Sequence, residues 1–144
     1  MLRMGLLTFV AVSLLVTGVF GDRMQNIGRG IPGGPIEADR NDQMFKTAVK
    51  KAVSHFNSGN NDMNLYKLNE IVSATSQVVS GIKYKFTVKL GRTSCRKAQL
   101  YVDAESCSLI SGSGQTTHLC HFEIWSQPWI SDEPSVTRHD CSVV

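Results

Sequence analysis

The chain is predicted to fold as one α+β domain, in which an antiparallel β-sheet of about four to five strands wraps around one long α-helix. Two patterns predict this fold. Apolar residues between about positions 41 and 57 recur with the period of a helix. After a turn at 59–62, the rest of the chain consists of short alternating segments typical of strands. A single helix followed by strands in hairpin connection favours a sheet that packs over the helix.

The predicted helix has one apolar stripe and recognisable ends. The stripe consists of Met44, Phe45, Ala48, Val49, Ala52, Val53 and Phe56. Asp39 and Asn41 are predicted N-caps, and Gly59 is a natural end. We assign this helix a structural role, as the element that the sheet covers.

The predicted strands differ in how regular their alternation is. Residues 82–91 alternate strictly between apolar and polar side chains, whereas 68–75 are the least regular. Further strands are predicted at 98–102, 118–126 and 136–141, with Cys120, Phe122 and Ile124 sharing one face. Residues 103–117 are predicted to form a long loop because serine and glycine are frequent there.

The first residues have the pattern of an export signal. Arg3 precedes an apolar or small stretch from 5 to 20, and Val19 and Gly21 suit cleavage after Gly21. We therefore expect residues 1–21 to be a signal peptide and residues 22–144 to be a single secreted domain. Residues 22–35 are rich in glycine and are predicted to be a mobile N-terminal arm. The alternative is an uncleaved membrane anchor.

Composition excludes some partners. The whole chain has 15 Lys and Arg against 12 Asp and Glu, and removal of Arg3 leaves a mature net charge near +2. This charge is too weak to predict nucleic-acid binding, and the lysines are scattered as on a solvated surface. No second apolar run is long enough to span a bilayer, so no membrane partner is expected.

Four cysteines at 95, 107, 120 and 141 indicate two disulfides in an exported chain. Three pairings are possible, of which the sequential one closes two short loops. A metal site is the alternative role for some of these residues, because zinc favours His and thiolate ligands at short spacing. The candidate ligands are His118, Cys120, His121, His139 and Cys141. On a strand, however, His118 and Cys120 share a face while His121 points away, and export pairs the thiols. We predict no metal and no cofactor.

Enzymatic activity is not expected. Paired cysteines leave no thiol nucleophile, and the serines lack a G-x-S-x-G motif. Asp103 and Glu105 are a pair of carboxylates, but their position in the predicted loop indicates solvated charges.

Three uncharged segments are the candidate functional elements. The first contains Ile31, Pro32 and Gly33, the second contains Gln77, Val78, Val79, Ser80 and Gly81, and the third contains Pro128 and Trp129. Taken one at a time, the first segment is explained as a flexible joint, the second as an ordinary hairpin, and the tryptophan of the third as a core residue. In this order, and with residues 90–95 running into the first cysteine, they resemble the secreted (type 2) cystatins. The resemblance extends from about Gly33 to the C-terminus.

The resemblance implies a cystatin fold and a function. It implies a reversible, competitive, tight-binding inhibitor of papain-like cysteine proteases (cathepsins), whose three segments form a wedge in the active-site cleft. It also implies disulfides Cys95–Cys107 and Cys120–Cys141. Pro32 departs from the open-chain aliphatic residue common before the key glycine, and it lacks an N–H to donate. We expect a monomer that can also form a dimer by domain swapping.

A second site is predicted after the helix. Asn61 and Asp62 match a pair that some secreted cystatins present to the asparaginyl endopeptidase legumain, although Asn and Asp are also common turn residues. The alternative function for the whole chain is a secreted, non-inhibitory binding or carrier module on the same fold.

Overall fold

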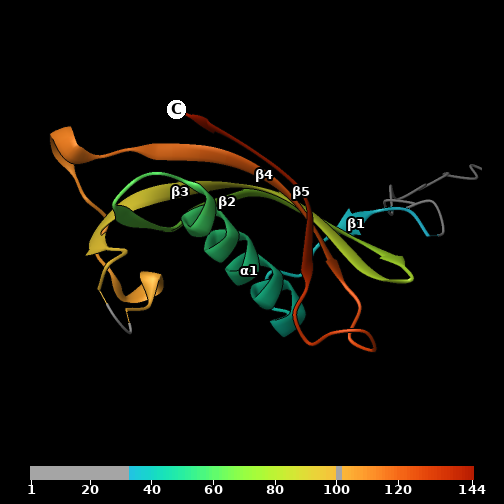
Figure 1. The fold of residues 1–144 in the computed structure, drawn as a ribbon. Helices are drawn as coiled ribbons and strands as arrows, with labels where there is room; N and C mark the ends of the chain where they lie inside the picture. The colour runs from blue at the N-terminus through green and yellow to red at the C-terminus, as the bar shows by residue number, and fades with distance from the viewer. Residues whose placement is uncertain (1–32, 100–101) are drawn as a thin grey trace, which may run out of the picture.

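The computed structural model describes residues 33–99 and 102–144, in which one helix lies against a five-stranded antiparallel sheet (Figure 1). The strands follow the chain in the order β1-β2-β3-β4-β5. Their bounds are β1 Ile36–Glu37, β2 Asn64–Val79, β3 Gly81–Arg96, β4 Thr117–Ser126 and β5 Ser135–Val143, and helix α1 is Gln43–Gly59. The predicted fold class is confirmed. The predicted signal peptide, most of the arm, and Ile31 and Pro32 lie outside the described residues.

The N-cap of helix α1 is Asp42, one residue after Asn41 and three residues after Asp39, the two predicted caps. Its backbone is extended and its carboxylate accepts a hydrogen bond of 3.3 Å from the Met44 N–H. Asp39 instead accepts from the Asn41 N–H at 2.9 Å and forms the turn before the helix. The helix ends at Gly59, as predicted, and the following residue has an extended backbone.

The apolar stripe of α1 faces the sheet and forms the core with it. Phe45 packs edge-to-face against Tyr84 and Phe86, with ring centroids 5.7 and 5.8 Å apart. Buried residues of the helix and the sheet form one cluster, which includes Ala48, Val49, Ala52, Phe56, Val88, Leu90, Cys120, Phe122 and Ile124. The shared face predicted for β4 is therefore confirmed.

Register shifts explain the weak alternation of β2. The pairing with β3 is irregular between Leu68 and Glu70 and again between Ile71 and Ser73. Each irregularity changes the face to which the following side chains point. Leu68 and Ile71 consequently both pack against the core, although they are three positions apart and would point to opposite faces of a regular strand.

The strand predicted at 98–102 is wrong for residues 98, 99 and 102, which are not in a strand, and residues 100 and 101 lie outside the described residues. The chain turns directly after β3, where the Gln99 N–H donates to the Arg96 carbonyl at 3.1 Å and the Arg96 N–H donates to Gln99 Oε1 at 3.0 Å. Both edges of β3 are occupied, by β2 and β4. The short β1, which pairs with β2, was not predicted.

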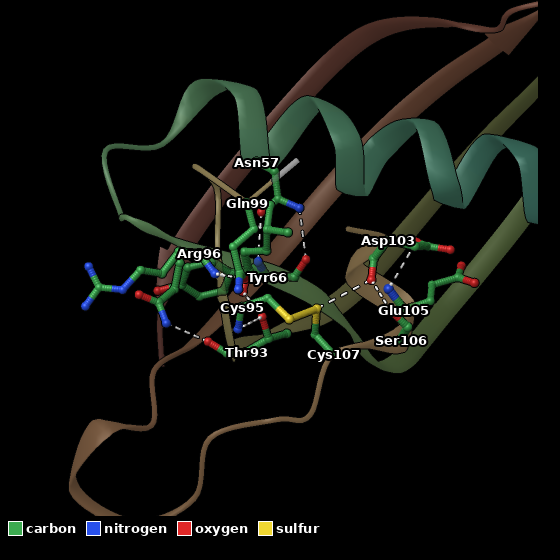
Figure 2. The surroundings of a disulfide bond; sticks show 12 residues. Asn57, Tyr66, Thr93, Cys95, Arg96, Gln99, Asp103, Glu105, Ser106 and Cys107 are labelled. Carbon is green, nitrogen blue, oxygen red and sulfur yellow. Dashed lines mark hydrogen bonds between the residues drawn. A yellow bond between two sulfur atoms is a disulfide. The ribbon is translucent and has the colours of Figure 1, made fainter. Parts of the chain in front are cut away.

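The long loop contains two short 3₁₀-helices, η1 (Ala104–Ser106) and η2 (Gly112–Gly114). A disulfide from Cys95 to Cys107 joins it to the end of β3 (Figure 2), and a second joins Cys120 in β4 to Cys141 in β5. Asp103 caps η1 through a hydrogen bond from the Glu105 N–H. In the described part of the chain, no helix is long and apolar enough to cross a membrane.

Candidate functional site

The turn between β2 and β3 is as short as a hairpin allows. Val79 pairs with Gly81, so Ser80 alone forms the tip. Gly81 has a φ of +98°, and a Cβ there would overlap the carbonyl oxygen of Ser126 at the end of β4. Only glycine suits both constraints. The turn leaves Val78 73% exposed and Val79 37% exposed.

The connection between β4 and β5 presents a tryptophan. The carbonyl of Gln127 accepts hydrogen bonds from the N–H groups of Ile130, at 2.9 Å, and Ser131, at 3.1 Å. Pro128 and Trp129 therefore occupy the two central positions of a turn, and proline suits the first of them because its φ is fixed. The Trp129 side chain is 64% exposed and the next residue, Ile130, is 68% exposed.

The two turns are joined through one carbonyl group. The Ser80 carbonyl accepts from Trp125 Nε1 at 2.9 Å and from Gln127 Nε2 at 3.3 Å. Lys83 Nζ lies 6.0 Å from the centroid of the Trp125 ring. Sequence reasoning missed Trp125 and Gln127, because nothing in the local pattern shows that the end of β4 reaches the tip of the first hairpin.

The start of the described chain lies along the same hairpin. Gln77 Nε2 donates to the Gly33 carbonyl at 2.9 Å, and Gly33 has a φ of +82°. Ile36 in β1 pairs with Ser76 and is 59% exposed. The structure thus brings Gly33 beside the hairpin, while Ile31 and Pro32 precede the described residues.

The assembled surface is uncharged at its centre and flanked by charge. Residues 77–81 and 127–131 contain no charged side chain. Behind them, Glu123 pairs with Lys83 at 3.3 Å and with Lys85 at 3.7 Å. Burial raises the pKa of Glu123, but hydrogen bonds from Lys83 and Thr137 and the two lysine charges outweigh this and lower the pKa overall. The carboxylate is therefore ionised and neutralised by its neighbours.

The family model for the cystatin domain matches residues 33–129, a stretch that includes the Gly33 contact, the first hairpin and the Pro128–Trp129 turn. This chain belongs to the cystatin family. It is 39% identical over 119 residues to a cystatin from Oncorhynchus mykiss, an alignment covering 82% of this chain and 89% of the relative. A cystatin from Oncorhynchus keta is 42% identical over 104 residues, covering 72% and 78% of the two chains.

Solved structures agree with this assignment. Dimeric human cystatin F superposes with a TM-score of 0.70 at 32% identity, covering 78% of this chain and 88% of that chain. The structure of Al-CPI gives a TM-score of 0.64 at 28% identity, covering 78% of this chain and all of that chain. Cystatins act as cysteine protease inhibitors rather than as enzymes. Membership of the family therefore supports, at the level of the family, a role for this chain as a cysteine protease inhibitor.

The Asn61–Asp62 loop of this cystatin lies at the opposite end of the sheet from the hairpin. The Asp62 carboxylate accepts from the Tyr66 hydroxyl at 2.8 Å and the Asn64 N–H at 2.9 Å, and lies 3.2 Å from Arg92 Nη2. Burial raises the Asp62 pKa, but these donors and the Arg92 charge lower it overall. Burial and the Asp62 contact raise the pKa of Tyr66 to about 12. Asn61 is exposed.

The histidine and cysteine cluster considered in the sequence is dispersed in this cystatin. Cys120 and Cys141 are bonded to each other, and the His118 ring packs against Phe56 with centroids 5.0 Å apart. His121 lies on the other face, where its Nδ1 is 2.7 Å from Thr87 Oγ1. Among residues 33–99 and 102–144, no three His, Cys, Asp or Glu side chains are grouped as a metal site.

Proposed function

We propose that this cystatin is exported after removal of residues 1–21 and is a reversible, competitive, tight-binding inhibitor of papain-like cysteine proteases, the cathepsins among them. The observation that supports this most strongly is the contact between separate segments at one end of the sheet. The Gln77 side chain donates a hydrogen bond to the Gly33 carbonyl. The Ser80 carbonyl accepts hydrogen bonds from Trp125 and Gln127, at the end of β4 that leads to Pro128 and Trp129.

The exposed side chains at this end suit a protease cleft. Such clefts are concave and partly apolar. Val78, Val79, Trp129 and Ile130 are exposed apolar residues on two tight turns. Valine has restricted χ1 rotamers, so its ordering in a complex loses little entropy. Gly33 has a positive φ. We expect the arm residues Ile31 and Pro32, which lie outside the described residues, to occupy the non-primed subsites without presenting a peptide bond to the nucleophile.

Titration of the mature protein against papain tests the proposal. Inhibition should be competitive with substrate and reversible on dilution. Papain whose catalytic thiol carries a small blocking group should still bind, because no covalent step is involved. Absence of both inhibition and binding at micromolar concentration would reject the proposed function.

A second proposed site is the exposed Asn61, which would bind legumain. The supporting observation is that Asp62 is held by Tyr66 and Arg92, so the loop presents Asn61 at the far end from the wedge. Asn61→Lys should abolish legumain inhibition and leave papain inhibition unchanged. A ternary complex with both proteases should form, and a wild-type protein that fails to inhibit legumain would reduce Asn61 to a turn residue.

The alternative, a non-inhibitory binding or carrier module, is favoured by one other feature. A groove of about 650 Å³ lies between α1 and β2, with apolar walls that include Val49, Val53, Leu68 and Ile71. Its volume is within the range of small-molecule sites. A protein that leaves papain fully active and retains a small apolar ligand through purification would support this alternative.

A further inference from the structure

Two histidines from separate elements meet at the edge of the sheet. Nε2 of His55, on α1, lies 3.3 Å from Nδ1 of His139, on β5, and the ring centroids are 4.6 Å apart. No other hydrogen bond to either ring is found among the described residues. One helical turn earlier, Lys51 Nζ pairs with Glu133 at 3.0 Å, in the connection between β4 and β5. One side of α1 is thus tied to the β4–β5 hairpin at two levels.

The separation of the two nitrogens fits a shared metal ion. Zinc bonds imidazole nitrogen at about 2.0–2.1 Å in a tetrahedral arrangement, so two nitrogen ligands of one ion lie about 3.3–3.4 Å apart. The observed 3.3 Å matches this edge of the tetrahedron. Without an ion, the two nitrogens can share only one proton between them, because a proton on each would bring two donors together.

The surroundings leave space for the remaining ligands. A surface hollow of about 310 Å³ is lined by both histidines and by Asn60 and Asp140. The hollow is open to solvent, so water can complete the coordination. Lys51, whose charge also acts on His55, is paired with Glu133.

We propose that His55 and His139 bind a Zn²⁺ ion, with water in the remaining coordination positions, and that this ion links α1 to β5. Imidazole ligands favour zinc and neighbouring transition metals over Mg²⁺ and Ca²⁺, which prefer oxygen ligands. The proposed site uses neither disulfide and none of the three inhibitory segments, so it is independent of the proposed function.

Zinc titration of the mature protein, residues 22–144, tests this site. Calorimetry should give one ion per chain. The melting temperature should rise with zinc concentration, because the two ligands are brought together only in the folded state. Of the four histidine ring signals in an NMR spectrum, only two should move on addition of zinc. Mg²⁺ should produce none of these effects.

Three substitutions assign the ligands. His55→Gln and His139→Gln should each weaken zinc binding by about tenfold or more. His121→Gln, on the opposite face of the sheet, should leave binding unchanged. Circular dichroism of each metal-free variant verifies the fold. Wild-type affinity in both ligand variants, or no rise of the melting temperature with zinc, would overturn the proposal. If acidification alone disturbs the two rings and zinc does not, the pair is a proton-sensitive contact and not a metal site.

Discussion

Replacement of Trp129 by alanine separates a binding role from a structural one. The side chain is 64% exposed, so it contributes little to the core but can be buried by a protease. If a fully buried indole covers about 250 Å², the exposed part is roughly 160 Å², equivalent to about 4 kcal/mol at 25 cal/mol per Å². Ordering and imperfect desolvation reduce this to about 2–4 kcal/mol, the range for interface aromatics. The inhibition constant for papain should rise about 30- to 700-fold.

The assay measures the papain inhibition constant and the melting temperature of the same preparations. Met63→Ala is a matched control, because Met63 is 66% exposed but precedes β2 at the other end of the sheet. It should leave the inhibition constant unchanged. Val79→Asp should behave like Trp129→Ala, because it places a carboxylate in a dry cleft. A large fall in melting temperature with near-normal inhibition, or equal inhibition by the Trp129 and Met63 variants, would refute this reasoning.

Three further outcomes are expected. Trp125→Phe removes one donor to the Ser80 carbonyl, a hydrogen bond worth about 0.5–1.5 kcal/mol of folding stability, so it should lower the melting temperature by several degrees and raise the papain inhibition constant, because the first turn loses a contact that positions it. The lowered Asp62 pKa means that its stabilising effect is present above its ordinary pKa of 3.8 and is lost as pH falls through the folded value, so Asp62→Asn should flatten the loss of stability between pH 5 and pH 2 in urea unfolding. Truncation before Gly34 should weaken cathepsin binding without unfolding the domain, and Pro32→Val should tighten binding; unchanged affinity in both would show that the arm is no anchor.

Periodicity predicted the helix and the central strands because each has one buried face. It failed where polar side chains are buried. β3 continues to Arg96, past the predicted end at 91, through Thr93, which is fully buried and donates its hydroxyl to the Leu65 carbonyl at 2.7 Å. A threonine in such a position does not extend an apolar pattern. The helix cap was misplaced because three Asp or Asn residues lie between 39 and 42, and local sequence does not decide among them.

The sequence predicts which residues make up the candidate site, but it does not predict the contacts that bring them together. The residues of the two turns were predicted from turn-forming types and from the family resemblance. The contacts that join them depend on the register between β3 and β4, which pairs Ile82 with Ser126 and brings Trp125 to Ser80. Similarly, His55 and His139 are 84 positions apart, and only the packing of α1 on β5 brings them together.

Hydrogen–deuterium exchange of the mature protein with and without papain tests the central claim most directly, since it maps the contact surface itself. The account predicts new protection at residues 77–81 and 127–131, where the two turns enter the cleft, and unchanged exchange at the 60–63 loop. Protection confined to the 60–63 loop or to the groove between α1 and β2, with both turns exchanging as in the free protein, would contradict the account.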